Sequence, residues 1–298
     1  MDKVDYFLEE IEKRNPVHYR QINKIILNFD NEWRNFTNTY LNKFEEYLKE
    51  KNRDFIYGIE SYLKVVNDTM MEQYDFMKNG EYSCKSFKDA YEKVYSNSEV
   101  MEYHMTGLMF TQLFWKNHYE TFRYFSKNIG KYLKSTKEYL EIGGGHGLFV
   151  TEVIKNININ SQITLLDISE TSLKMAKSIL KNGKINYILS DIFDVEDIEK
   201  YDFITMGEVL EHVENPAKLL RKIYNMMQKD GLFFITVPIN SPAIDHIYLF
   251  KNEDEVRKLI IDSGFKIEEE VVVKSENIKP ELEEKLKISK MYCTFLKK

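Results

Sequence analysis

The stretch EIGGGHG, Glu141 to Gly147, decides the fold of the second half of this chain. It follows the short apolar run EYLEI and opens the helical pattern HGLFVTEVIKN, so a strand, a glycine loop and a helix are expected in that order. Glycines at Gly143, Gly145 and Gly147 let the backbone turn tightly and approach a ligand closely. The amides at the start of the helix are then free to bind that ligand.

Beyond this loop, apolar runs of strand length alternate with helical patterns as far as the last residues. Strands are predicted at 138–143, 163–169, 185–191, 201–209, 232–238, 265–274 and 288–298, and helices at 146–156, 172–183, 215–231 and 253–264. Such alternation predicts an α/β domain with a parallel, doubly wound sheet. The last two strands are too close in sequence for a usual crossover helix, so an antiparallel edge is expected.

The first half of the chain has a different character, because only four of the 12 glycines precede residue 135. Apolar residues recur every three or four positions from Ile22 to Tyr47 and again from Ile59 to Met77, which predicts two long helices. The segment from Ser98 to Gly130 is apolar on nearly every face, so one or two buried helices are expected there. We therefore predict an all-helical N-terminal domain over residues 1–133 and an α/β domain over residues 134–298.

Composition and charge disfavour several classes of protein. With 43% hydrophobic and 30% charged residues, the chain has enough apolar residues for a core. A net charge of −6 disfavours a broad nucleic-acid-binding face. No apolar run reaches membrane-spanning length, and the first residues lack an apolar signal segment, so neither a transmembrane helix nor a secretory signal is expected. The two cysteines, Cys84 and Cys293, have no metal-like spacing, and a reducing, cytoplasmic location is expected.

Two aspartates strengthen the interpretation of the glycine loop as part of a nucleotide-binding edge. Asp167 ends the strand after the loop, and a carboxylate at that point can accept hydrogen bonds from ribose hydroxyls. Asp191 ends the third strand, where a carboxylate can meet the exocyclic amine of an adenine. Ile168 and Ile192 follow them and are placed to pack on the adenine faces. Each aspartate alone could instead cap a helix or turn, but the ordered set favours a ligand.

The motifs EIGGGHG, LLDIS, SDIF, YDFITMGEVLEH and GLFFITVP, in this order, resemble those of the class I S-adenosylmethionine-dependent methyltransferases. The resemblance covers about residues 133–298 and implies a Rossmann-like domain with a seven-stranded, mostly parallel sheet. A nicotinamide-dependent enzyme is the main competing interpretation, but its loop more typically has the pattern Gly-x-Gly-x-x-Gly.

The resemblance implies S-adenosyl-L-methionine as the cofactor. Glu141 and the Gly143–Gly147 loop would hold its methionine end, Asp167 its ribose, and Asp191 with Ile192 its adenine. The implied cofactor-binding set is Glu141, Gly143, Gly145, Gly147, Asp167, Ile168, Asp191, Ile192 and Gly207.

The stretch GEVLEHVENP, Gly207 to Pro216, brings Glu208, Glu211 and His212 together after the fourth predicted strand. If these residues form a helical turn, the three side chains lie on one face and suit a divalent metal ion. His246, just past the fifth strand, could add a fourth ligand. These four residues are also the candidate catalytic groups.

The cluster is similar to stretches in two methyltransferase groups, the ubiquinone-pathway O-methyltransferases and the small-RNA 3′-end 2′-O-methyltransferases. In the second group a Glu-x-x-Glu-His stretch and a later histidine hold a metal beside the acceptor hydroxyls. Many class I methyltransferases carry an EVLEH-like stretch without a metal, so His212 acting alone as a base, with glutamates that cap the next helix, remains the alternative.

Five aromatic or imidazole side chains of the Ser98–Gly130 segment are candidates for contact with the methyl acceptor. They are Tyr103, His104, Trp115, His118 and Tyr119. An aromatic wall suits an apolar or planar small molecule. The same residues could instead belong to the core or to a homodimer interface of the helical domain.

We therefore predict a methyltransferase that transfers a methyl group to a small-molecule acceptor, with O-methylation slightly favoured and a divalent metal as a candidate second cofactor. The alternatives are N- or C-methylation with a histidine base and, disfavoured by the acidic charge, 2′-O-methylation of RNA ends. A non-catalytic cofactor- or partner-binding module is the alternative from another class.

Overall fold

The computed structural model describes residues 2–283 and 285–298. Its first part is helical: α1 (Lys3–Arg14), α2 (Pro16–Ile26), α3 (Trp33–Glu50), α4 (Phe55–Asn79), α5 (Phe87–Ala90), the π-helical turn η1 (Tyr91–Tyr95), α6 (Ser98–Phe114), α7 (Lys116–Ile129) and the turn η2 (Leu133–Ser135). Its second part alternates: β1 (Glu138–Ile142), α8 (Leu148–Asn156), β2 (Gln162–Asp167), α9 (Glu170–Leu180), β3 (Ile185–Leu189), η3 (Ile192–Asp194), β4 (Tyr201–Gly207), η4 (Leu210–His212), α10 (Pro216–Met226), β5 (Met227–Ile239), α11 (Glu253–Asp262), β6 (Lys266–Lys274), α12 (Pro280–Glu283) and β7 (Lys290–Lys297).

The seven strands form one sheet in the order β3-β2-β1-β4-β5-β7-β6. The pairs from β3 to β5 are parallel, whereas β7 runs antiparallel to both β5 and β6. The predicted Rossmann-like sheet with a reversed edge is therefore confirmed. The strand order reverses between β1 and β4, and ligands of open α/β sheets bind beyond the carboxyl ends of the strands at such a point.

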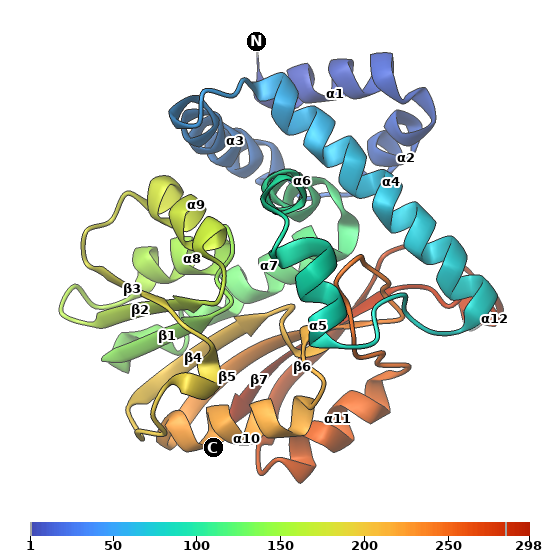
Figure 1. Ribbon diagram of the computed structural model, residues 1–298. Helices are drawn as coiled ribbons and strands as arrows, with labels where there is room; N and C mark the ends of the chain where they lie inside the picture. The colour runs from blue at the N-terminus through green and yellow to red at the C-terminus, as the bar shows by residue number, and fades with distance from the viewer. Residues whose placement is uncertain (1, 284) are drawn as a thin grey trace.

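Helices cover both faces of the sheet (Figure 1). On one face, apolar residues of α7, α8 and α9 share a buried cluster with strand residues that include Tyr139, Leu165 and Phe234. On the other face, α10 and α11 pack in the same way against strand residues that include Ile204 and Ile235. α7 lies at the end of the helical region in sequence. Because it packs on the sheet, however, it belongs to the layer of helices over the strands.

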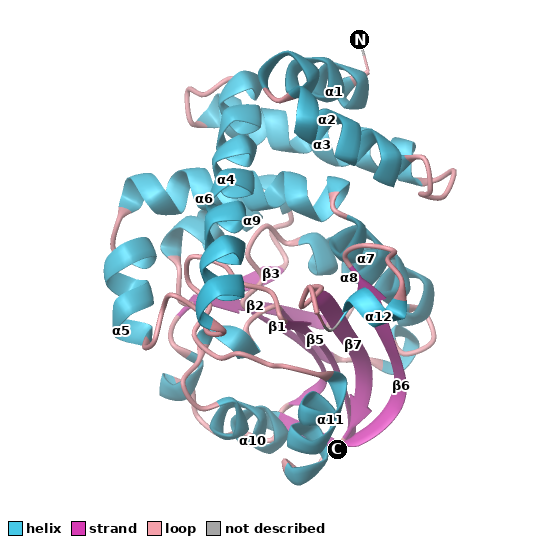
Figure 2. Ribbon diagram, turned by 90° about the vertical axis from the view of Figure 1, so that its right-hand side faces the viewer, coloured by secondary structure: helices cyan, strands magenta, loops and turns pink. Residues whose placement is uncertain are grey.

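The helices α1 to α6 form a cap beyond the sheet. Figure 2 shows α1, α2 and α3 at the end of the molecule far from the strands, with α6 between them and the sheet. The core of this cap includes three residues that follow β1 or β2, namely Leu148, Met175 and Ile179. The hydroxyl of Tyr40 on α3 also donates to the carbonyl of His146 in the glycine loop, at 3.1 Å. The cap and the sheet are thus joined through a shared core, which includes the buried α6 that the sequence predicts.

The predicted single helix from Ile22 to Tyr47 is wrong, because the chain turns between α2 and α3. Asp30 lies in this turn, where its carboxylate accepts the amide of Trp33, the first residue of α3, at 3.1 Å. The same carboxylate accepts the Tyr119 hydroxyl at 2.9 Å and binds Arg123 on α7. A side chain that bonds local backbone and distant partners competes with helix continuation, and amphipathic spacing alone does not reveal it.

The predicted helix over 215–231 is too long at its C-terminal end. α10 ends at Met226, and β5 already begins at Met227, which pairs with Tyr201 of β4. Met227 is fully buried, and Asp230 adopts a left-handed conformation with φ 61°. Pairing with β4 outweighs the helical propensity of the NMMQK run.

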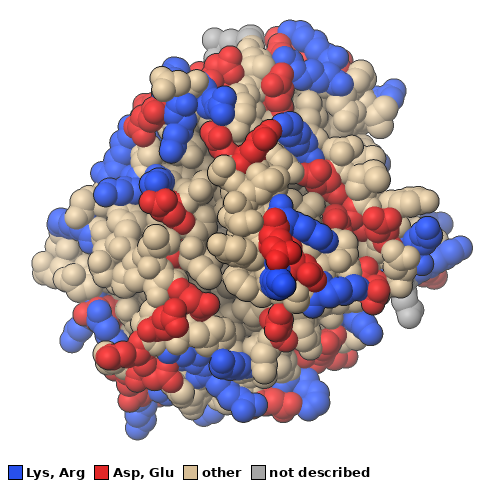
Figure 3. Space-filling model, viewed as in Figure 1, with Lys and Arg blue, Asp and Glu red and all other residues tan. Residues whose placement is uncertain are grey.

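On the face shown in Figure 3, acidic and basic side chains are interspersed, and neither sign forms a continuous face. Among the described residues, no helix combines the length and apolar character needed to cross a bilayer.

Candidate functional site

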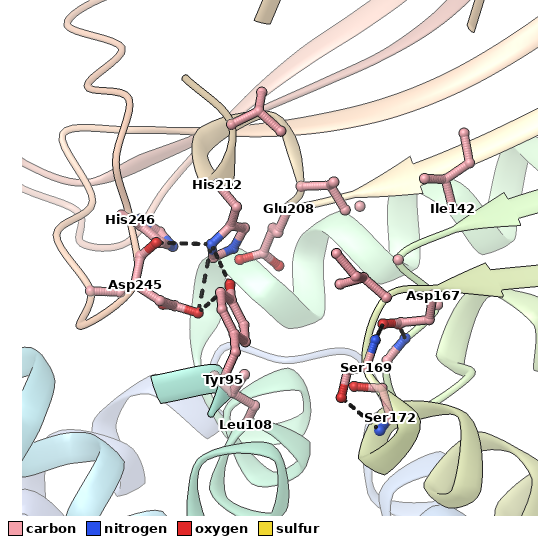
Figure 4. Close-up of a pocket in the computed structure, with 18 of the residues that line it drawn as sticks. Tyr95, Leu108, Ile142, Asp167, Ser169, Ser172, Glu208, His212, Asp245 and His246 are labelled. Atoms are coloured by element: carbon pink, nitrogen blue, oxygen red, sulfur yellow. Dashed lines mark hydrogen bonds and ion pairs between the residues drawn. The ribbon is translucent and has the colours of Figure 1, made fainter. Parts of the chain in front are cut away.

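A cavity of about 950 Å³ lies between the cap and the carboxyl ends of β1, β2 and β4. One side is formed by the glycine loop and the residues that follow β2 and β3, and the other by α6, α7 and the segments after β4 and β5. Figure 4 shows that residues of both sides point into this space. The glycine loop and the residues after β2 and β3 form the predicted cofactor edge. The cavity therefore joins this edge to the predicted cluster of Glu208, Glu211, His212 and His246.

The glycine loop takes a conformation that other residues resist. Gly143 and Gly145 have φ values of +66° and +47°, in the left-handed region. A Cβ on Gly143 would overlap the side chain of Val209, whereas Gly145 faces the cavity beneath Met105. Gly147 lies at the N-cap of α8, outside the cavity lining. The loop thus leaves backbone rather than side chains along the floor of the cavity.

The carboxylate of Asp167 accepts hydrogen bonds from backbone amides of two segments, the glycine loop and the turn after β2. Its carboxylate accepts the Ser169 amide at 2.8 Å and the Gly145 amide at 3.2 Å. Burial raises the pKa of Asp167 to about 6, although these amides favour the charged form. The next residue, Ile168, is half exposed toward the cavity, so an apolar ligand surface would cover it.

Asp191 and Ile192 also line the cavity, next to Phe193. One oxygen of Asp191 accepts the Phe193 amide at 2.9 Å and so caps η3. Asp191 therefore does cap a turn, as the sequence allowed. Because Asp191 also lines the cavity, its second carboxylate oxygen is available to a ligand.

Glu141 and Gly207 are the two members of the predicted cofactor-binding set that lie within strands β1 and β4. Glu141 is buried in β1 and accepts the Tyr139 hydroxyl at 2.9 Å. Burial raises the pKa of Glu141 to about 8. A Cβ on Gly207 would meet the ring of Phe149, so glycine is needed there for packing. Both residues line the cavity.

Glu208 does not join the cluster that the sequence predicts. The helical turn after β4 begins only at Leu210, and Glu208 has a left-handed backbone with φ 53°. Its carboxylate points to the cap, 3.5 Å from Nε2 of His118 and 3.5 Å from Nε2 of Gln112. The expectation that Glu208, Glu211 and His212 share one face of a helical turn is wrong for Glu208, because the left-handed backbone redirects its side chain.

The other three candidates do come together. Glu211, His212 and His246 each offer an atom within 4.8 Å of the others. The Oε1 atom of Glu211 lies 3.6 Å from Nε2 of His212 and 3.8 Å from Nε2 of His246. Glu211 is fully buried, and neither of its oxygens has a hydrogen-bond partner among the described residues. A buried carboxylate without partners is costly, so a proton or a cation is needed there.

Backbone carbonyls fix both imidazole rings. Nδ1 of His212 lies 3.1 Å from the carbonyl of Asp245, and Nδ1 of His246 lies 2.6 Å from the carbonyl of Ser241. A carbonyl only accepts, so each Nδ1 carries the proton and each Nε2 keeps its lone pair. The two lone pairs then lie on the side of Glu211. Ligand histidines in metal sites are oriented in the same way.

Asp245 and Tyr95 belong to this site and were not singled out in the sequence. The Tyr95 hydroxyl donates to Oδ2 of Asp245 at 3.0 Å and lies 3.2 Å from Nδ1 of His212 (Figure 4). Oδ2 of Asp245 is also 3.6 Å from Nδ1 of His212 and 3.9 Å from Nε2 of His104. The adjacent DH pair was a signal for Asp245, whereas Tyr95 lies in a polar segment without a motif.

The charges in this group are strongly coupled. Burial alone would raise the pKa of Asp245, but the surrounding histidines, His212 first, lower it to about 2. Burial disfavours the charged form of His212, but the surrounding carboxylates, Asp245 and then Glu211, together with the Asp245 carbonyl outweigh it and raise the pKa of His212. Burial raises the pKa of Glu211 to about 8 and lowers that of His246 to about 3. His212 is thus the imidazole best placed to take up a proton.

Three of the five candidate acceptor contacts line the cavity, namely His104, Trp115 and His118. Tyr103 and Tyr119 lie outside it: the Tyr103 hydroxyl donates to Asp68 on α4, and Tyr119 is buried in the core of the cap. Adjacent helical residues point about 100° apart. Because His104 and His118 face the cavity, their neighbours Tyr103 and Tyr119 face away from it.

Comparison with known proteins places the chain in a family. The family described as a methyltransferase domain matches residues 114–270, which is more than half of the chain and includes α7 and the sheet from β1 into β6. A curated relative, the ubiquinone biosynthesis O-methyltransferase of Glaesserella parasuis, is 28% identical over 132 residues, covering 42% of this chain and 54% of the relative. The malonyl-[acyl-carrier protein] O-methyltransferase 1 of Ilyobacter polytropus is 31% identical over 100 residues, covering 33% and 37%.

The chain therefore spans about half or less of the length of these curated relatives. Among solved structures, the N-methyltransferase NodS of Bradyrhizobium japonicum, in complex with S-adenosyl-L-homocysteine, has a similar fold, with a TM-score of 0.50 and 13% identity over 70% of this chain and 98% of the other. The family match, the order of the strands and the glycine loop at the end of β1 agree with one another, and the chain belongs to the class I S-adenosylmethionine-dependent methyltransferases.

Proposed function

We propose that this protein methylates a hydroxyl group of a small molecule, with S-adenosyl-L-methionine as the methyl donor. The observation that carries the proposal is that the cofactor edge and the His212 cluster open into one cavity. Its volume of about 950 Å³ lies near the top of the range of ~300–1,000 Å³ for small-molecule sites. There is room for a cofactor and an acceptor together.

The residues of the cofactor edge fit the donor. The bare backbone of Gly143 and Gly145 would lie along its methionine end, Asp167 would accept hydrogen bonds from its ribose, and the exposed Ile168 would be covered by its adenine. The donor supplies a methyl group on an electrophilic sulfonium, so the protein mainly has to align the acceptor with it.

A hydroxyl acceptor must also lose its proton, and His212 is the candidate base. Its Nδ1–H is tied to the Asp245 carbonyl, so the free Nε2 can receive the proton. The Asp245 carboxylate, 3.6 Å from Nδ1, would stabilise the imidazolium that results. The His118–Glu208 pair lies on the cap side of the same cavity and is the candidate for holding the acceptor.

Glu211, His212 and His246 would also fit a divalent metal ion, and metal assistance is the alternative to His212 as the base, because Nε2 of His212 cannot bind a metal and accept a proton at the same time. The orphaned oxygens of Glu211 and the two oriented histidines support it. A bound metal would lower the pKa of an acceptor hydroxyl and fix its position. If no metal binds, His212 with Asp245 serves equally for an amine acceptor, and N-methylation is the second candidate.

The names of the curated relatives support O-methylation, since both are O-methyltransferases. The test is a screen of labelled methyl transfer from S-adenosyl-L-methionine to phenols, alcohols, carboxylic acids and amines, with His212→Ala as the comparison. Transfer to a hydroxyl that falls at least about 100-fold in His212→Ala would support the proposal. Cofactor binding without transfer to any member of the screen would favour a binding module.

The metal has its own test. Elemental analysis of the purified protein, after incubation with Mn²⁺ or Zn²⁺ and desalting, should find about one ion per chain. Glu211→Ala should lose that ion, and Glu208→Ala should keep it because Glu208 lies outside the three-ligand group. Retention of the ion by both variants would contradict the assigned ligands, and metal-free wild-type protein would remove the metal from the proposal.

A further inference from the structure

The segment from Tyr82 to Tyr95, here called the strap, crosses from α4 to α6 and contributes one wall of the cavity. Phe87, Lys88, Tyr91 and Tyr95 of the strap line the cavity. Phe87 and Tyr91 line the cavity, yet their side chains are 37% and 51% exposed. The strap therefore separates the acceptor side of the cavity from solvent.

The strap is attached differently from the rest of the cap. The helices α1, α3, α4 and α6 share a large buried core, into which Leu148, Met175 and Ile179 also pack. Of the strap residues, Val94 belongs to that core and Tyr95 packs against it. Tyr82, Cys84 and Ala90 of the strap are buried outside that core, and segments with fewer contacts to a large core open at lower free energy than core helices. The strap, and not the whole cap, is the part of this wall suited to open.

Hydrogen bonds hold the strap to the segments that carry the candidate base. The Tyr82 hydroxyl accepts the Ser241 amide at 3.0 Å, and the Cys84 thiol donates to the Ile244 carbonyl at 3.1 Å. The Phe87 amide donates to Glu214 at 3.0 Å. The contacts of Tyr95 with Asp245 and His212 complete this set. Among the described residues of the sheet domain, the strap thus bonds to the 241–246 segment and to the turn after β4, and to little else.

Tyr95 ends a π-helical turn, in which the Ser96 amide reaches back five residues to the Tyr91 carbonyl at 2.8 Å. Such turns are rare and frequently occur at functional sites. The ring of Tyr95 stacks on Phe87 at 6.1 Å between centroids, and its hydroxyl lies between Asp245 and His212. One residue of the strap therefore touches both the base and the carboxylate beside it.

We propose that Tyr95 is a positioning residue, through which the closed strap orients His212 and Asp245 for proton transfer from the acceptor. This inference rests on the proposed function. The hydroxyl donates to Asp245 and offers its oxygen to Nδ1–H of His212, so it favours the tautomer with a free Nε2. When the strap opens to admit an acceptor, this support is withdrawn, and it returns when water has been excluded.

Two readouts test the inference on the full chain. Hydrogen–deuterium exchange of the 241–246 amides should accelerate about tenfold in Tyr95→Phe, the effect expected from loss of one hydrogen bond to a charged group. The matched control is Tyr91→Phe, since Tyr91 belongs to the same turn but is exposed, and it should leave the exchange unchanged. If the effect runs through Asp245, the Tyr95→Phe and Asp245→Asn substitutions should be non-additive.

The second readout reports on His212 itself. In protein labelled with ¹⁵N at its six histidines, the ring signals of His212, assigned by their loss in His212→Ala, should show one tautomer protonated at Nδ1. Tyr95→Phe should add a second population protonated at Nε2. A purely structural role of Tyr95 would not change this ratio.

Titration with S-adenosyl-L-homocysteine separates this inference from the proposed function. Tyr95→Phe should bind it with wild-type affinity, because the cofactor edge lies on the other side of the cavity. Failure of the wild-type protein to bind would overturn the proposed function. An unchanged His212 tautomer and unchanged exchange in Tyr95→Phe, with binding intact, would overturn the role of Tyr95 alone.

Discussion

Replacement of Asp167 by asparagine tests the cofactor edge most directly. The carboxylate is held by the amides of Ser169 and Gly145, and its remaining acceptor capacity faces the cavity. Asparagine has nearly the same shape, but it removes the charge and turns one acceptor oxygen into a donor. A hydrogen bond to a charged group contributes about 1.5–3 kcal/mol. We therefore expect S-adenosyl-L-homocysteine to bind Asp167→Asn roughly 10- to 150-fold more weakly at pH 8.

The same group gives a dependence on pH with a definite sign. Burial raises the pKa of Asp167 to about 6, above its value of about 3.9 in an unfolded chain. The contribution of this group to the free energy of unfolding is therefore fully present below about pH 4 and is lost as the pH rises through 6. Cofactor affinity should move the opposite way and increase through pH 6, because the ionised carboxylate accepts hydrogen bonds better.

Isothermal titration calorimetry between pH 5 and 8 measures the affinity, and urea denaturation measures the free energy of unfolding. Asp254→Asn is the matched control, since Asp254 is an exposed acid on α11 outside the cavity. A Kd of Asp167→Asn within threefold of the wild-type value at pH 8 would refute the assignment of Asp167 to the ribose.

Three further substitutions probe other parts of the molecule. Gly143→Ala should lower the free energy of unfolding by about 1–3 kcal/mol in urea denaturation, because Gly143 has a positive φ and the new Cβ would overlap Val209. A loss below about 0.5 kcal/mol, the scale of ordinary surface changes, would contradict this packing. Glu211→Gln should raise the thermal stability of chelator-treated protein at pH 9, because this pH lies above the Glu211 pKa of about 8 and the substitution removes an unpaired buried charge. Equal stability of the variant and the wild-type protein at pH 9 would mean that Glu211 has a partner. Trp33→Phe should cost about 2–3 kcal/mol, because the indole donates to the buried Leu113 carbonyl at 2.7 Å, and an unchanged urea midpoint would show that water replaces that bond.

The order of strands and helices after β1 could be predicted because it depends on local patterns. Short apolar runs, glycines and helix-capping residues repeat along 138–298, and each is read within a few residues. The boundary at Met227 and the break at Asp30 were missed because both depend on partners far away in sequence. Met227 pairs with Tyr201 in the sheet, and the Asp30 carboxylate binds Tyr119 and Arg123.

The candidate site was predictable to the extent that its side chains follow strand ends. The carboxyl ends of parallel strands meet at one edge, so Gly143, Asp167 and His212 were expected near one another, and the structure places all three on the same cavity. The direction of a single side chain was less predictable. Glu208 turns away from Glu211 because of one left-handed residue, and Tyr103 and Tyr119 face away from the cavity by a fraction of a helical turn.

The sequence by itself determined the fold class, the family resemblance and the candidate cofactor edge, since glycine loops and strand-end aspartates are local signals. Only the tertiary structure decided what lies opposite that edge. It grouped Glu211, His212 and His246 and separated Glu208 from them, and it brought Tyr95 to Asp245 across 150 residues of sequence. Such contacts depend on how the cap packs on the sheet, and no periodicity within a single segment encodes that packing.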